Sequence, residues 1–224
     1  MSELSNSTEN NSIIPWLWKR IKRIPFTLCM VVILLVVAWV THSYFQELAR
    51  IWINRLGFAP RDFWLFRWER LFLSALVTAG GITFWLALVM VAITSGVSEW
   101  KTGSFRAVVA FWGVHLVTLI MESALFLLPL HQLGFPQARA VFFSRDVGPS
   151  AGYMGSLGYV IALLPKPWRW LVFWAIMIFL VVSFFITPPP GQTLAIKLAD
   201  DMAHLIAFPL GWLTAKLIGR RSAA

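Results

Sequence analysis

The sequence predicts an all-α membrane protein with six transmembrane helices. Hydrophobic residues make up 58% of the 224 residues and charged residues only 13%, and the mean hydropathy is +0.72. A water-soluble domain of this size cannot hide so much apolar surface in one core. The 13 Trp and 18 Phe residues suit a chain with many lipid-facing and interfacial positions. The lipid bilayer is therefore the expected environment.

Apolar windows of about 20 residues, the length of a helix that crosses the hydrocarbon core, mark the helices. They cover residues 25–43, 71–95, 106–130, 147–165, 168–187 and 197–219. The expected organisation is a polar and basic N-terminal tail (1–24), a membrane domain (25–219) and a short basic C-terminus (220–224).

An even number of spans places both termini on one side of the membrane. Basic residues precede the first span and follow the last, and basic residues favour the cytoplasmic side. We expect a multi-pass protein of the bacterial inner (plasma) membrane with both termini in the cytoplasm. Five arginines between Arg50 and Arg70 lie in the longer loop "QELARIWINRLGFAPRDFWLFRWER", whose Trp and Phe spacing predicts an interfacial helix on the outer face.

The formal net charge is +9, which in a soluble protein would suggest nucleic acid as a partner. Here the basic residues lie mainly between apolar segments, so anionic lipid headgroups are the expected partner and nucleic acid is not. The single cysteine, Cys29, excludes an internal disulfide and a metal site built on several thiolates.

Ionisable residues inside spans are costly and mark functional candidates. The third segment has His115 and Glu122 on one helical face with Thr118. Three interpretations stay open for His115 and Glu122: an internal pair whose polar groups bond to each other, a proton-handling site and a catalytic site.

The sixth segment has Asp200, Asp201 and His204, with Asp200 and His204 one turn apart on one face. The two acids lie near the predicted start of the helix, where carboxylates cap it and complement its dipole. Capping is therefore one interpretation of both acids.

Ser150 begins the fourth segment inside "DVGPSAGYMGSLGYVIALLP". Alone, such a serine is most simply a hydrogen-bonding or packing residue. The G-x-S-x-G pattern also marks soluble hydrolases, but that motif requires a preceding strand that this chain lacks. Ser150 and His204 are both predicted in the outer half of the bilayer, where an imidazole could remove the proton of a serine nucleophile.

Small residues would let these two helices approach closely. They are Gly148, Gly152, Gly155 and Gly158 on the fourth helix, and Ala207 and Gly211 on the sixth.

Four stretches of the sequence match spaced motifs of one known kind of membrane protein. "GPSAGYMGSLG" resembles G-x-S-G-x-x-[FY]-G-x-x-G of the fourth helix, and "DDMAHLIAFPLG" resembles D-x-x-A-H-x-x-G-x-x-x-G of the sixth. "GVSEWKTGSFR" is similar to the turn between the second and third helices, and "RWERLFLSAL" to the approach to the second. Together these stretches resemble the rhomboid family of intramembrane serine proteases, and the resemblance covers residues 67–219.

The resemblance implies a six-helix rhomboid-like bundle, a catalytic Ser150/His204 dyad, and cleavage of transmembrane protein substrates that enter from the lipid beside the fifth helix. It implies no cofactor and no metal. The His and Asn that hold the oxyanion in the family are missing from "VTAGGITFWLAL". The expected oxyanion donors are therefore the backbone N–H of Ser150 and the hydroxyls of Thr78 and Thr83.

Two other functions remain open. A rhomboid-fold pseudoprotease would bind transmembrane helices without cutting them. A small proton-coupled transporter would use His115, Glu122, Asp200 and His204 as a relay through the membrane.

Overall fold

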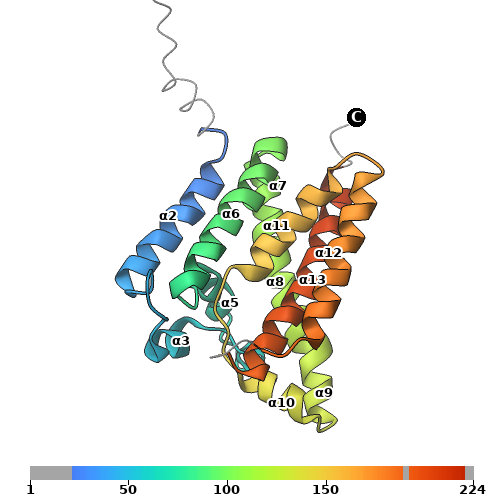
Figure 1. Ribbon diagram of the computed structural model, residues 1–224. Coiled ribbons are helices and arrows are strands. Elements are labelled where there is room, and N and C mark those ends of the chain that lie inside the picture. The colour runs from blue at the N-terminus through green and yellow to red at the C-terminus, as the bar shows by residue number, and fades with distance from the viewer. Residues whose placement is uncertain (1–21, 189–191, 220–224) are drawn as a thin grey trace, which may run out of the picture.

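The computed structural model describes residues 22–188 and 192–219, and within them the chain is helical without a strand (Figure 1). The long helices are α2 (Pro25–Val40), α6 (Gly81–Thr102), α12 (Trp168–Phe185) and α13 (Leu194–Gly219), with the shorter α11 (Ser150–Ala162) among them. Another long helix is continuous from Ser104 to Gln132. The all-α prediction is confirmed. Most of the predicted tail (1–24) and the predicted C-terminus (220–224) lie outside the described residues.

Within the described residues, three helices are long and apolar enough to cross a membrane: Gly81–Thr102, Ser104–Gln132 and Trp168–Phe185. They correspond to the second, third and fifth predicted segments. α2 is apolar but has only 16 residues, α11 has 13, and α13 contains Lys197, Asp200 and Asp201. These three candidate spans support the prediction of a membrane protein.

The second predicted segment begins ten residues later than expected, at Gly81. Residues 71–76 belong instead to short helices that precede it. Gly80 interrupts the chain with φ of +86°, and a Cβ there would lie 2.4 Å from the carbonyl oxygen of Gln46. Only glycine fits this break, which hydropathy alone cannot reveal.

The third predicted segment bends through two π-helical stretches. It runs through α7 (Ser104–Val108), η2 (Val109–Gly113), α8 (Val114–Met121), η3 (Glu122–Leu127) and α9 (Leu128–Gln132). Such wide turns rotate the following side chains and recur at functional sites. His115 lies on the regular helix α8 between them, and Glu122 is the first residue of η3.

The loop predicted as an interfacial helix forms short helices: α3 (Arg50–Leu56), α4 (Pro60–Trp64), α5 (Glu69–Leu73) and the 3₁₀ turn η1 (Ser74–Leu76). We call residues 50–76 the outer segment, after the face on which the sequence predicts it. Trp64, Phe66 and Trp68 are exposed there, as expected for side chains at a lipid headgroup boundary. The outer segment lies at one end of the bundle, and the first and last described residues lie at the opposite end (Figure 1).

Glu99, near the end of α6, holds α2 in place. Its carboxylate accepts hydrogen bonds from the backbone N–H groups of Phe26 and Thr27 and from the hydroxyls of Thr27 and Ser104. These bonds satisfy donors at the start of α2 that have no partner within that helix. The stretch "GVSEWKTGSFR" thus joins three helices.

α11 lies at the centre of the bundle, between α6 and α13 (Figure 1). A Cβ added at Gly211 would lie 1.9 Å from the oxygen of Gly155, and one at Gly158 would lie 2.0 Å from the oxygen of Phe208. A Cβ at Gly152 would meet the ring of Phe111 at 2.6 Å. The backbones of α11 and α13 are therefore in direct contact, which requires small residues on both helices.

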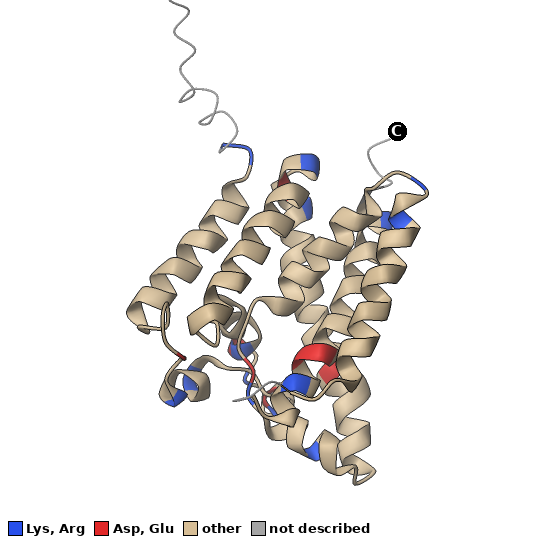
Figure 2. Cartoon of the chain, viewed as in Figure 1, with Lys and Arg blue, Asp and Glu red and all other residues tan. Residues whose placement is uncertain are grey.

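The charges gather at the two ends of the bundle, and one acidic turn lies on α13 (Figure 2). α10 (Pro136–Phe143) connects the third long helix to the segment before α11. The two ends of the described chain lie at the same end of the bundle (Figure 1).

Candidate functional site

Ser150 is the first residue of α11, and the segment before it is fixed by backbone hydrogen bonds. The N–H of Gly148 donates to the carbonyl oxygen of Ser74 at 2.9 Å. Asp146 and Phe58 exchange two backbone hydrogen bonds of 2.9 and 3.0 Å. The outer segment and the residues just before it therefore position the start of α11.

The Ser150 hydroxyl donates a hydrogen bond to Oδ1 of Asp200 at 3.1 Å. Nε2 of His204 lies 3.2 Å from the same oxygen, close but not aligned as a hydrogen bond. The Ser150 hydroxyl and His204 can be no farther apart than the sum of these contacts, about 6.3 Å. The structure thus brings together the predicted pair, with Asp200 between them in place of the predicted direct contact within about 3.5 Å.

The capping interpretation of Asp200 and Asp201 is wrong. α13 begins at Leu194, so both acids lie beyond its first turn. Asp201 forms an ion pair with Lys197 and accepts a hydrogen bond from the Ser183 hydroxyl at 3.0 Å. Each acid contacts a neighbouring helix, Asp200 toward α11 and Asp201 toward α12.

The Tyr153 ring lies beside His204, with 6.3 Å between the ring centroids and a tilt of 41°. Tyr153 is one turn along α11 from Ser150, and aromatic packing restricts the orientation of an imidazole. The ring therefore helps to define where the His204 side chain points.

A small cavity lies beside Ser150, with about 20 Å³ open to the centre of a water molecule. That is room for about one oxygen-sized group. Two buried polar atoms at this cavity have no hydrogen-bond partner among the described residues: Oγ of Ser74 and Nδ1 of His115. The cavity is lined by Phe58, Ser74, His115, Leu119, Asp146, Gly148, Ser150, Ala151 and Ala203.

His115 and Glu122 do not form the predicted pair. Nε2 of His115 lies 2.9 Å from the carbonyl oxygen of Leu71, so Nε2 carries a proton and, in the neutral ring, Nδ1 is an acceptor. Within residues 22–188 and 192–219, no hydrogen bond joins His115 to Glu122. His115 is directed instead at the backbone of Leu71, in the short helices that precede α6.

The predicted oxyanion donors Thr78 and Thr83 do not line the cavity at Ser150. The Thr78 hydroxyl lies 3.4 Å from the N–H of Gly80, within the turn that precedes α6. Thr83 is exposed on α6. The first turn of α11 lies at the cavity instead, through Ser150 and Ala151.

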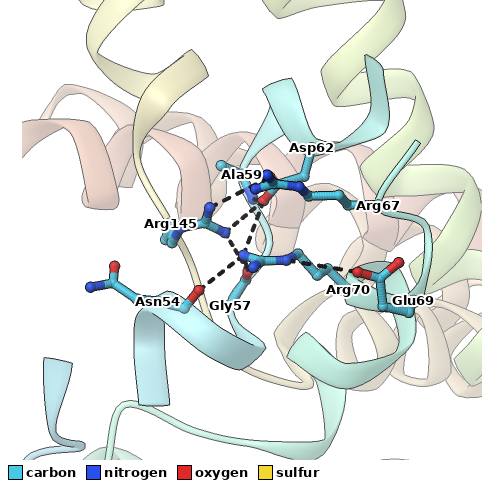
Figure 3. Close-up of polar contacts among 8 residues, drawn as sticks. All are labelled: Asn54, Gly57, Ala59, Asp62, Arg67, Glu69, Arg70 and Arg145. Atoms are coloured by element: carbon cyan, nitrogen blue, oxygen red, sulfur yellow. Dashed lines mark hydrogen bonds and ion pairs between the residues drawn. The ribbon is translucent and has the colours of Figure 1, made fainter. Parts of the chain in front are cut away.

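A network of arginines around Asp62 joins the outer segment to the residues before Ser150 (Figure 3). Asp62 is fully buried, and its carboxylate lies 2.6 Å from Nη1 of Arg145. Nη1 of Arg67 and Nη1 of Arg70 each lie 3.5 Å from the same carboxylate. Arg145 and Arg70 also donate to the carbonyl oxygen of Gly57, at 2.9 and 3.2 Å. Charge-assisted hydrogen bonds of this kind stabilise the contact and fix how the two segments lie against each other.

Asp146 follows this network directly, in the half-buried loop between α10 and α11. Its Oδ1 accepts a hydrogen bond from the N–H of Val147 at 2.8 Å. Burial, followed by the nearby negative charge of Asp200, raises the pKa of Asp146 to about 7. This carboxyl group therefore titrates near neutral pH beside the candidate site.

In the part of the chain that the structure describes, no three His, Cys, Asp or Glu side chains converge as a metal ion requires. Comparison with known protein families and with curated proteins finds no match for this chain.

Proposed function

We propose that the protein is an intramembrane serine protease of the rhomboid type, with Ser150 as nucleophile and His204 as general base. One observation supports this most: the Ser150 hydroxyl and the His204 ring contact the same oxygen of Asp200 among apolar helices. The motif resemblance and the close packing of α11 on α13 agree with the proposal.

In this mechanism a change of the Ser150 rotamer brings Oγ from Asp200 to Nε2 of His204. His204 takes the hydroxyl proton as Oγ attacks a peptide carbonyl, and later returns it to the leaving amine. Asp200 stabilises the imidazolium that forms, as the acid of a serine protease triad does. An ester on Ser150 results, and water then hydrolyses it.

The substrates in this proposal are membrane-anchored proteins. α12 is the least buried of the three candidate spans and faces lipid with Ile178, Phe179 and Val182. A substrate helix would approach the Ser150 site from the lipid on the α12 side. The proposal places both termini in the cytoplasm, and a reporter fused to Ala224 that is active only outside would contradict this orientation.

The decisive experiment is labelling by a fluorophosphonate probe, which reacts with an activated serine whatever the natural substrate. We expect the parent to be labelled, and the Ser150→Ala and His204→Ala variants to be unlabelled. Ser156→Ala is the matched control, because Ser156 is a buried serine on the same helix that contacts Ser95 instead. Equal labelling of the parent and Ser150→Ala would refute the protease.

A second candidate is a rhomboid-fold pseudoprotease, and the hydrogen bond of Ser150 favours it. A serine that donates its proton to Asp200 is not activated by His204 in this arrangement. If the parent is not labelled but a photo-crosslinker on α12 captures single-span membrane helices, the binding function replaces the catalytic one.

A further inference from the structure

The cavity beside Ser150 has the position and the donors of an oxyanion site. When a serine attacks a carbonyl carbon, the carbonyl oxygen becomes negative and needs hydrogen-bond donors. The first N–H groups of a helix have no partner within the helix. Ser150 and Ala151 open α11 and line the cavity, so their N–H groups are available to a negative oxygen there.

Ser74 adds an unused side-chain donor to the same cavity. It is only 3% exposed, and its hydroxyl has no hydrogen-bond partner among the described residues. A buried hydroxyl without a partner costs free energy and is uncommon in folded proteins. The backbone of Ser74 is held to the Ser150 segment by the 2.9 Å hydrogen bond from the N–H of Gly148.

We propose that the Ser74 hydroxyl is the side-chain oxyanion donor of the Ser150 site, in place of Thr78 and Thr83. This inference rests on the proposed protease function. Ser150 Oγ bonds to the carbonyl carbon, the carbonyl π electrons move to the oxygen, and the Ser150 proton passes to His204. The Ser74 O–H donates a hydrogen bond to the new oxyanion and keeps its proton.

The other polar group without a partner at the cavity does not compete for this role. His115 donates from Nε2 to Leu71, so its Nδ1 offers a lone pair, which a negative oxygen does not need. Of the described side chains that line this cavity without a partner, only Ser74 offers a proton.

The test measures the rate at which a fluorophosphonate labels Ser150, because phosphonylation also builds negative charge on an oxygen at this position. We expect Ser74→Ala to lower the maximal labelling rate by about 100-fold or more, the size seen when an oxyanion donor is removed. The probe concentration at half-saturation should stay unchanged, because the donor acts on the transition state.

Ser98→Ala is the matched control. Ser98 is also fully buried with an unpartnered hydroxyl, but it does not line the cavity. Its labelling rate should equal that of the parent. Both variants should melt at or above the parent temperature, because each removes an unsatisfied buried group. A lower rate without lower stability separates a catalytic role from a structural one.

The outcomes are distinct. Equal rates for Ser74→Ala and Ser98→Ala overturn the Ser74 proposal and leave the protease intact. An unlabelled parent refutes the protease itself. If Ser74→Ala does not fold, Ser74→Cys decides, since a thiol of similar size is a weak donor: a loss of rate supports the proposal and the parental rate overturns it.

Discussion

α11 and α12 both pack against α13, but they contact it in different ways. α11 contacts α13 backbone to backbone, with Gly155 against Gly211 and Gly158 against Phe208. α12 contacts α13 through rings, with Phe173 stacked on Phe208 at 5.4 Å and Trp170 against Trp212 at 4.9 Å. Only 11% of the α12 span is buried, against 39% for each of the other candidate spans.

This difference separates a fixed interface from a displaceable one. Backbone contact leaves no side chain that can rotate aside, so the distance from Ser150 to Asp200 and His204 is set by the helices themselves. α12 is held by side chains and by the polar contacts of Lys197 and Asp201 with Ser183. Moving α12 would therefore disturb the Ser150 site much less than moving α11.

The largest effect should come from Gly211→Ala. The new methyl would lie 1.9 Å from the oxygen of Gly155, so the two helices must separate. We expect loss of folded protein and of fluorophosphonate labelling, both measured after purification in detergent.

Gly113→Ala is the control for that variant, because its methyl would meet Val109 at an ordinary 3.5 Å. It should keep parental labelling and gain slightly in stability from the better helix propensity of alanine. If Gly211→Ala folds and is labelled like the parent, the contact between α11 and α13 can adjust, and the contrast with the α12 contact fails.

A smaller effect should come from Lys197→Met, at the α12 interface. The change leaves the carboxylate of Asp201, which is 8% exposed, without its cation, at a cost of about 3 kcal/mol in unfolding free energy. Titration with SDS in mixed micelles measures this loss. Lys101→Met, at an exposed lysine on α6, should change little.

The double variant Lys197→Met, Asp201→Leu sharpens the test. It removes both charges and should recover most of the lost stability, with faster hydrogen exchange confined to the end of α12, where Ser183 lies. A spread of faster exchange into α11 would show that the two interfaces are coupled.

A further effect depends on pH and concerns Asp146, just before α11. Because the pKa of Asp146 is raised from 3.8 to about 7, the folded protein binds a proton that the unfolded chain releases. Stability should therefore fall as the pH rises from about 4 to about 7 and then level off. The melting temperature of Asp146→Asn should fall less over the same range, and identical profiles would show that Asp146 does not titrate in this window.

The apolar segments were predictable because hydropathy reports burial in lipid directly. α6, the long helix from Ser104 and α12 lie where their composition indicates. The beginning of α6 was not predictable, because Gly80 breaks the helix through a contact with Gln46 from another part of the chain. Hydropathy also could not separate the outer segment into α3, α4 and α5.

The proximity of Ser150 and His204 was predictable from the sequence, but their contacts with Asp200 were not. The spacing of Asp200 and His204 predicted a shared face, and the glycines predicted a close approach of the two helices. That Ser150 would bond Asp200 depends on the register of two helices 50 residues apart. Ser74 and Arg145 carried no signal, because a single serine or arginine acquires its role only from what lies next to it in space.

The arginine network around Asp62 has a consequence for the order of events during synthesis. Arg145 follows Asp62 by 83 residues, and Phe58 pairs with Asp146. Chains emerge from the ribosome N-terminus first, so residues 50–76 are made well before these partners exist. The segment can reach its final form only once Arg145 has left the ribosome, after α6 and the long helix from Ser104 have been synthesised.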